Sequence, residues 1–394
     1  MIKKLLLVVV GLTLLIPAIT CAPTEPNVET INIGCVLSTS GLLGPKGEER
    51  MAAARLAVEE INSEGGILGK QVRLIEEDDA TKADKCLKQI KKIVTSDGVK
   101  VLVGGMSSGA VMASGHYLAE NEVLMVSPSA TAAEISNQIW TNWIFRTAPS
   151  DALQGRVLAR VIMDRGFTRL ATIVQANSYG AGLEKALVNS LENVEWTGKH
   201  VIAVHFDPNK GDHLNQLNNI KDSNPDVILA VTYIEDGIRV FKQALEADLT
   251  EIAWLGCDGN YGEQMFTDPE CAEFMEKAII AGTRHVSPSS ATYDEFASAY
   301  AAATGKAPGV YCDTTYDAIK MIAESIEKAG VYDGAAIRDA LFEIGQKYQG
   351  ASGRIIFDDK GDRVTSIYEL WNVEKDPATE TGYKNIRIEL ISIG

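Results

Sequence analysis

The chain has 394 residues, of which 46% are hydrophobic and 23% are charged, and this composition excludes a wholly disordered or fibrous protein. Its 37 basic and 53 acidic residues give a formal net charge of −16, which disfavours nucleic acid as a partner. Only five histidines are present, and no two cysteines are spaced as CxxC, so we expect no metal site.

An export signal is predicted at the N-terminus. Two lysines precede an apolar run over residues 5–19, which is shorter than the roughly 20 residues that cross a bilayer. Cys21 follows directly, and the sequence AITC that it ends resembles the lipobox of bacterial lipoproteins, in which the cysteine is lipidated. We expect residues 1–20 to be a signal peptide, Cys21 to carry a lipid anchor in the membrane, and residues 21–28 to form an extended tether. The alternative is a short N-terminal membrane anchor.

Short apolar segments alternate with segments of helical periodicity along the next part of the chain. In a first unit, strands are predicted at 31–37, 72–75, 99–103 and 123–126, with helices at 48–61, 83–94 and 110–119. In a second unit, strands are predicted at 170–174, 201–205, 227–231 and 252–255, with helices at 153–165, 182–191, 213–220 and 238–247. This alternation is typical of parallel sheets that helices cover on both faces.

The last third of the chain departs from this alternation. Its predicted elements are a strand at 278–281, helices at 293–303, 314–329 and 335–342, and strands at 354–357, 366–373 and 386–391. The helices would complete the cover of the first sheet, and the final strands would close the second. We therefore predict an α/β fold of two Rossmann-like lobes, joined by more than one crossing, with a ligand cleft between them.

Five cysteines remain after the predicted signal segment and Cys21. Disulfides can form in an exported protein. We expect Cys35, which lies inside an apolar strand, to be a free thiol, and Cys257 and Cys271 to be the first pair to test for a disulfide.

Polar side chains follow several of the predicted strands, at the edge where open α/β sheets bind ligands. Residues 104–109 and 127–131 lead toward helices, whose free N–H groups and neighbouring hydroxyls attract anions such as carboxylates. Plain helix capping is the alternative for each loop. Asp258 follows a strand of the second unit and would hold a cation, the alternative being a turn aspartate. Together, these groups would suit a zwitterion.

The segment Gly105-Met106-Ser107-Ser108-Gly109 also matches the G-x-S-x-G nucleophile elbow of α/β-hydrolases, and Asp258 and His285 would complete a triad with Ser107. A complete second α/β unit separates Ser107 from Asp258, so hydrolysis is the least favoured alternative. The glycine-containing segments 41–47 and 65–71 lack the spacing of dinucleotide and phosphate loops, so no cofactor is expected.

Several short motifs carry a family resemblance through their order and spacing. They are STSG at 38–41, EEIN at 59–62, GGILG at 65–69, DD at 78–79, SPSAT at 127–131, FRT at 145–147, YG at 179–180 and GASGRIIFDDKGD at 350–362. With them, the chain resembles the type I periplasmic substrate-binding proteins of ABC transporters, in the branch that binds leucine, isoleucine and valine. The resemblance covers residues 30–394.

The resemblance implies two lobes joined by three hinge crossings, near residues 146–150, 282 and 357–360. The first lobe would hold residues 29–147 and 283–357, and the second residues 148–282 and 358–394. It also implies an extracytoplasmic, monomeric binding protein rather than an enzyme. The lobes of such a protein close on an amino acid or a similar small carboxylate, and the protein delivers this ligand to a permease. A sensory receptor domain of the same fold is the alternative, and a following transmembrane or signalling segment would favour it.

The resemblance further implies a carboxylate site, an ammonium site and an aromatic wall. The matching positions for the carboxylate are Ser108 and Thr131, with Ala130 in the same loop. Those for the ammonium are the Ser129 carbonyl and Asp258, and those for the aromatic wall are Tyr179, Tyr233 and Tyr311. Lys46 replaces an aromatic residue of the family pocket. A buried lysine needs a polar partner, so Lys46 would meet a polar or acidic ligand group or point into solvent. The tyrosines instead favour an apolar or aromatic ligand.

Overall fold

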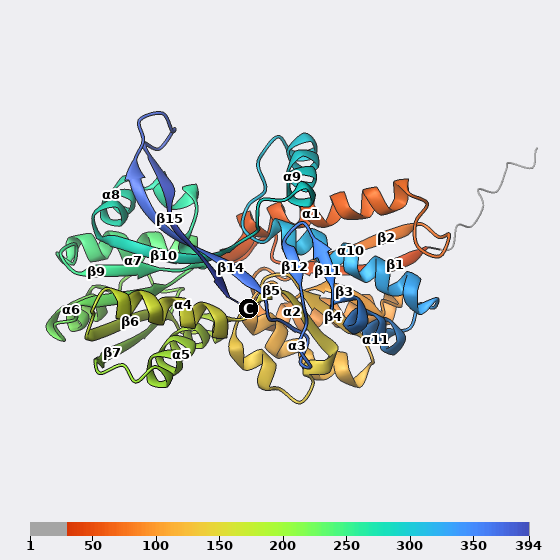
Figure 1. Ribbon diagram of the computed structural model, residues 1–394, viewed down its shortest axis with the longest axis horizontal. Coiled ribbons are helices and arrows are strands. Elements are labelled where there is room, and N and C mark those ends of the chain that lie inside the picture. The colour runs from red at the N-terminus through yellow and green to blue at the C-terminus, as the bar shows by residue number, and fades with distance from the viewer. Residues whose placement is uncertain (1–29, 394) are drawn as a thin grey trace, which may run out of the picture.

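The computed structural model describes residues 30–393, which form two α/β lobes side by side, each built on a central sheet (Figure 1). The predicted α/β fold of two lobes is confirmed. The predicted signal peptide, the lipidated Cys21 and the tether lie outside the described residues. Within residues 30–393, no helix combines the length and apolar character that a membrane span requires.

The first lobe has a six-stranded parallel sheet. Its spatial order is β13 (Asp362–Arg363), β5 (Ile144–Pro149), β4 (Leu124–Ser127), β3 (Val101–Gly104), β1 (Ile31–Leu37) and β2 (Val72–Asp78). The helices of this lobe are α1 (Gly44–Ser63), α2 (Ala83–Asp97), α3 (Ser108–Glu120), α9 (Ala291–Thr304), α10 (Cys312–Ala329) and α11 (Gly334–Ile344). A small hairpin, β11 (Tyr348–Gly350) with β12 (Gly353–Ile355), follows them.

The second lobe has a seven-stranded mixed sheet. Its spatial order is β15 (Tyr383–Ile393), β14 (Ser366–Lys375), β10 (Ile279–Val286), β9 (Ala253–Gly256), β8 (Val227–Val231), β6 (Arg169–Gln175) and β7 (Lys199–Phe206). Only the pairings of β14, with β10 and with β15, are antiparallel. The helices of this lobe are α4 (Asp151–Asp164), α5 (Ser178–Asn193), α6 (Leu214–Asp222), α7 (Ile234–Glu246) and α8 (Pro269–Ala278).

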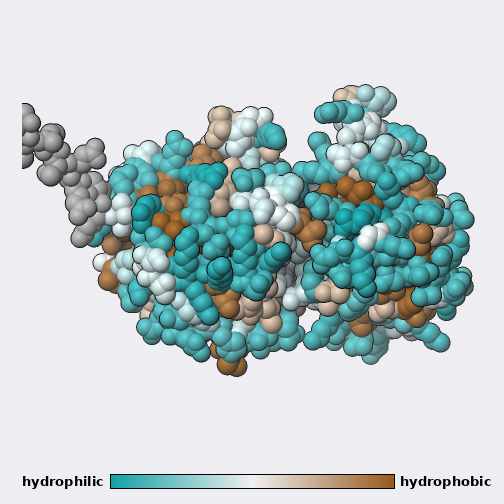
Figure 2. Space-filling view, turned by 180° about the vertical axis from the view of Figure 1, so that it is seen from behind, coloured by the Kyte–Doolittle hydropathy of each residue, from teal (hydrophilic) through white to brown (hydrophobic). Residues whose placement is uncertain are grey.

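Strand β1 shows why the apolar runs in the sequence are continuous. Ile33 and Cys35 belong to the core that α1 and α10 share, whereas Val36 belongs to the core on the other face, beneath α2 and α3. Successive side chains of a strand point to opposite faces, so a sheet that is covered on both faces buries every position. The surface of the molecule is mostly hydrophilic, with scattered apolar residues (Figure 2).

The chain crosses between the sheets after β5, after β10 and after β13. The second lobe boundary that we expected, at residue 282, falls inside β10, which stays paired with β14 through Val286. The third, at residue 357, precedes β13, which pairs with β5 in the first sheet. Neither strand end could be predicted from an apolar run. In β10, the polar residues Thr-Arg-His follow Gly282, and β13 consists of only two residues, both charged.

The expected disulfide between Cys257 and Cys271 does not form, and all five cysteines in residues 30–393 are free and buried. Cys257 follows β9, with its Sγ 3.2 Å from the Tyr179 hydroxyl oxygen, whereas Cys271 lies in α8 with its Sγ 3.9 Å from the sulfur of Met275. The two thiols thus face different neighbours. Cys35 is a free thiol, as expected, and burial raises its pKa far above the ordinary value.

Candidate functional site

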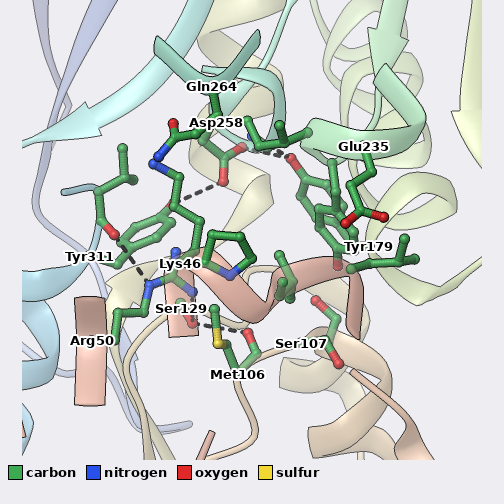
Figure 3. Close-up of a pocket in the computed structure, with 18 residues that line it drawn as sticks. Lys46, Arg50, Met106, Ser107, Ser129, Tyr179, Glu235, Asp258, Gln264 and Tyr311 are labelled. Carbon is green, nitrogen blue, oxygen red and sulfur yellow. Dashed lines mark hydrogen bonds between the residues drawn. The ribbon is translucent and has the colours of Figure 1, made fainter. Parts of the chain in front are cut away.

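A cavity of about 80 Å³ lies between the lobes, beyond the carboxyl ends of β3, β4 and β9 (Figure 3). Both lobes contribute to its walls. The first lobe supplies Leu42, Leu43, Pro45, Lys46, Arg50, Met106, Ser107, Ser108, Ser129, Val310 and Tyr311, and the second supplies Tyr179, Tyr233, Ile234, Glu235, Asp258, Gly259 and Gln264. A larger hollow of about 870 Å³ shares Ser107, Tyr179 and Tyr233 with it.

Asp258 is the acceptor at the centre of the second-lobe wall. It begins a short 3-10 helix, Asp258–Asn260, directly after β9. Its Oδ1 accepts hydrogen bonds from the Tyr179 hydroxyl at 2.8 Å and from the Gln154 amide at 3.1 Å, and its Oδ2 accepts one from the Tyr311 hydroxyl at 3.2 Å. Two of these donors come from the second lobe and one from the first. The carboxylate is thereby fixed in place and faces the cavity.

Three tyrosines line the cavity. Tyr179 and Tyr233 stack with their ring centroids 5.3 Å apart and an interplanar angle of 7°. Tyr311 lies opposite them and begins α10 from a left-handed backbone conformation, with a φ of 66°. Burial, followed by the nearby Asp258 charge for Tyr179 and Tyr311, raises the pKa of these phenols above the ordinary value. They therefore stay protonated and can donate to a carboxylate or to a ligand.

The two serine-containing loops of the first lobe meet at the cavity. Ser107 caps α3, and its Oγ accepts the Ala110 N–H at 3.3 Å. Ser108 lines the cavity, but its Oγ already accepts the Ala132 N–H at 3.1 Å. Ser129 donates to the Met106 carbonyl at 2.9 Å. These contacts order the loops beside the first turn of α3, where backbone N–H groups favour an anion.

Two residues of the expected carboxylate loop lie behind the wall. Ala130 is fully buried in the core beneath α2 and α3. Thr131 is 2% exposed, and its carbonyl accepts the Asp151 N–H at 2.7 Å. Its hydroxyl opposes the rise in the pKa of the Asp151 carboxyl. Neither residue lines the cavity.

Lys46 and Arg50 give the cavity two cations, both from α1. The Lys46 side chain is 13% exposed and lines the cavity, so it does not point into solvent. Arg50 was not predicted as a site residue. It donates from Nη1 to Ser129 Oγ at 3.1 Å and from Nε to the Val310 carbonyl at 3.2 Å. The one available signal was its spacing, since Arg50 lies one helical turn after Lys46 and so shares its face of α1.

The hydrolase alternative requires Ser107, Asp258 and His285 to form a hydrogen-bonded chain. His285 instead bonds through Nδ1 with Ser366 Oγ at 2.9 Å, and Asp258 accepts only the three donors described above. Within the described part of the chain, no hydrogen bond joins any two of the three residues. The geometry of a nucleophile and its base is therefore absent from this site.

Comparisons with known proteins identify the family over most of the chain. The profile of the family described as "Periplasmic binding protein" matches residues 30–377. The chain belongs to the periplasmic binding protein family. The resemblance inferred from the short sequence motifs is thereby confirmed.

Among the family members, a Leu/Ile/Val-binding protein, BraC3, from Rhizobium johnstonii is 30% identical over 360 residues, which cover 89% of this chain and 94% of the relative. A leucine-, isoleucine-, valine-, threonine- and alanine-binding protein from Pseudomonas aeruginosa is 28% identical over 90% of this chain and 93% of its own. The crystal structure of the leucine binding protein LivK from Thermotoga maritima matches with a TM-score of 0.80 and 22% identity, covering 92% of this chain and 98% of that one. At this identity, the structural match supports the periplasmic binding protein fold alone.

Proposed function

We propose that this protein is the extracytoplasmic solute-binding protein of an ABC transporter, which binds an amino acid or a related small carboxylate between its lobes and delivers it to a membrane permease. The observation that carries the proposal is one interlobe cavity in which an acid of the second lobe, Asp258, lies opposite the Ser107–Ser108 loop of the first lobe, where the first turn of α3 presents backbone N–H groups to an anion. A zwitterion would pair with both walls and hold the lobes together.

The named relatives support this proposal. Both curated relatives carry names of proteins that bind aliphatic amino acids. Structural neighbours from Rhodopseudomonas palustris were solved in complex with benzoate and with 4-hydroxybenzoate, so the fold also accommodates carboxylates that have no ammonium group. In our proposal, Asp258 receives the ligand ammonium, the Ser107–Ser108 loop at the start of α3 faces the α-carboxylate, and the tyrosines surround the rest.

The role of Asp258 can be tested by calorimetry on the purified protein with a panel of amino acids. At least one should bind, and Asp258→Ala should weaken that ligand by about 30-fold or more, because it leaves the buried ammonium without a partner. Asp164→Ala removes an aspartate that is 65% exposed on the same lobe, and it should bind like the wild type. Unchanged affinity in Asp258→Ala would refute the ammonium role.

Location and partners follow from the same proposal. A periplasmic binding protein acts outside the cytoplasm, and lipidation of Cys21 would keep it at the membrane beside its permease. The alternative is a sensory receptor of the same fold that takes no part in transport. A permease gene next to the gene for this chain would favour transport, and a signalling gene there would favour the receptor.

A further inference from the structure

Arg50 is a buried cation whose bonded neighbours are all neutral. The residue is 5% exposed, and its guanidinium donates to a hydroxyl and a backbone carbonyl and lies 5.2 Å from the centroid of the Tyr311 ring. Arg50 takes part in none of the ion pairs that occur within residues 30–393. A buried charge is costly without an opposite charge, because its neighbours replace only part of its hydration. An anion bound in the cavity in front of Arg50 would supply the opposite charge.

Lys46 adds a second positive charge at the same end of the cavity. Its Nζ lies 3.7 Å from Glu49 Oε2, which is beyond hydrogen-bonding distance, and that oxygen has no hydrogen-bond partner among the described residues. A methyl group built on Gly262 of the second lobe would lie only 3.3 Å from the same Nζ, so the ammonium reaches across the cleft. Glu49 thus compensates for Lys46 only in part.

No acid among the described residues forms an ion pair with Arg50, and Glu49 and Asp258 act on its charge only from a distance. Asp258 already accepts hydrogen bonds from three donors, and Glu235 is exposed at the rim. Figure 3 shows Arg50, Lys46 and Tyr311 together on one side of the pocket and Ser107 and Tyr179 on the other, with Asp258 between the two sides. The cavity therefore has two ends, and the cationic end is separate from the serine loop at the start of α3.

We infer that the ligand carries a second anionic group, as an amino acid with an acidic side chain does, and that Arg50 and Lys46 hold this group. The inference rests on the proposed function, which assigns the ammonium to Asp258 and the α-carboxylate to the Ser107–Ser108 loop at the start of α3. An aliphatic side chain at this end would leave Arg50 without an ion-pair partner and Lys46 with only its 3.7 Å contact to Glu49. A carboxylate would instead accept charge-assisted hydrogen bonds from the guanidinium and the ammonium.

The test compares ligands that differ only in the charge of the side chain. Calorimetry on the wild-type protein should show L-glutamate or L-aspartate binding about 10- to 100-fold more tightly than L-glutamine or L-asparagine, and more tightly than L-leucine. Equal or tighter binding of the neutral amino acids would overturn the inference and leave the proposed function intact. If no amino acid and no carboxylate binds, the proposed function fails as well. Glutarate, which lacks the ammonium, should bind more weakly than L-glutamate, and equal affinity would refute the role of Asp258 alone.

Variants separate the two ends of the cavity. Arg50→Gln and Lys46→Gln should each reduce the preference for L-glutamate over L-glutamine by about 10-fold or more and leave the affinity for L-glutamine nearly unchanged. Arg156→Gln removes an exposed arginine of α4 and should leave the preference intact. Equal losses for acidic and neutral amino acids would mean that Arg50 holds the α-carboxylate and would overturn the inference. Thermal unfolding should be measured for each variant to show that it is folded. If Arg50→Gln does not fold, the preference of Lys46→Gln for L-glutamate over L-glutamine still tests the inference.

Discussion

At the scale of single residues, Asp151 is an acid whose protonation should be visible in stability. It occupies the first turn of α4 and is fully buried behind the ligand cavity. Burial, and then the negative charge of Asp258, raises its pKa to about 8, although the Thr131 hydroxyl and Arg146 oppose the shift. Asp151 is therefore neutral in the folded protein over a pH range in which it is ionised in the unfolded chain.

This shift predicts a pH-dependent stability. A raised native pKa means that the folded state binds the proton more tightly, so the contribution of Asp151 is complete below pH 3.8 and is lost as the pH rises toward 8. Asp151→Asn removes that titration. Between pH 5 and pH 8, the free energy of unfolding in urea should fall more for the wild type than for the variant. Parallel changes in the two proteins would contradict the prediction.

The same scale shows what sequence reasoning can find in a binding site. Most of the residues proposed from the sequence line the cavity, namely Asp258, the three tyrosines, Ser108, Ser129 and Lys46. They could be proposed because they follow strand ends or match the spacing of family motifs. Thr131 does not line the cavity, because it contacts Asp151 at the start of α4. That contact depends on where α4 begins relative to the first lobe, which the sequence does not show. Arg50 carried no motif. In the sequence it resembles a solvated helical residue, and only the structure shows that it is buried among Ser129, Val310 and Tyr311 and lines the cavity.

At the scale of helices and strands, the fold was predictable where burial is uniform and not where polar residues are buried. Most strands of both sheets followed from the apolar runs, but β5 did not, because it buries the polar residues Arg146 and Thr147. The second half of β10 did not, because its Arg284 is paired with Glu369 on β14 and its His285 is bonded to Ser366. Hydrogen-bond partners of this kind allow polar side chains to be buried in a strand. Because the partners are distant in the sequence, no local pattern predicts them.

The packing of α4 on α5 gives a prediction at this scale. A methyl group on Gly155 of α4 would lie 2.6 Å from the backbone carbon of Ala186, and a helix backbone cannot move aside easily. Alanine favours a helix by about 1 kcal/mol over glycine, but overpacking costs about 1–3 kcal/mol. Gly155→Ala should therefore lower the unfolding midpoint in urea. Gly211→Ala should leave the midpoint unchanged, because nothing lies within 4 Å of the added methyl group. Equal midpoints for the wild type and Gly155→Ala would show that α4 and α5 can separate.

At the scale of the whole molecule, the three crossings are tied to one another while the lobes meet across the cavity. Arg363 Nη1 donates to the Thr147 carbonyl at 3.1 Å, which links the first and third crossings, and His285 bonds to Ser366 across the second and third. Across the cleft, the Tyr311 hydroxyl of the first lobe bonds to Asp258 of the second at 3.2 Å. This arrangement suits hinge motion, with a fixed base and contacts at the mouth that can open.

Ligand binding should therefore make the molecule more compact. A saturating ligand, identified by calorimetry, should reduce the radius of gyration measured by small-angle X-ray scattering, since it bridges walls that belong to different lobes. Tyr311→Phe removes one hydrogen bond across the cleft, and we expect it to weaken the ligand by about 3- to 10-fold while the ligand-bound form stays compact. Tyr117→Phe changes a half-buried phenol on α3, away from the cavity, and should behave as the wild type. A tight ligand that leaves the radius of gyration unchanged would contradict closure, because the lobes would then already be held together without it.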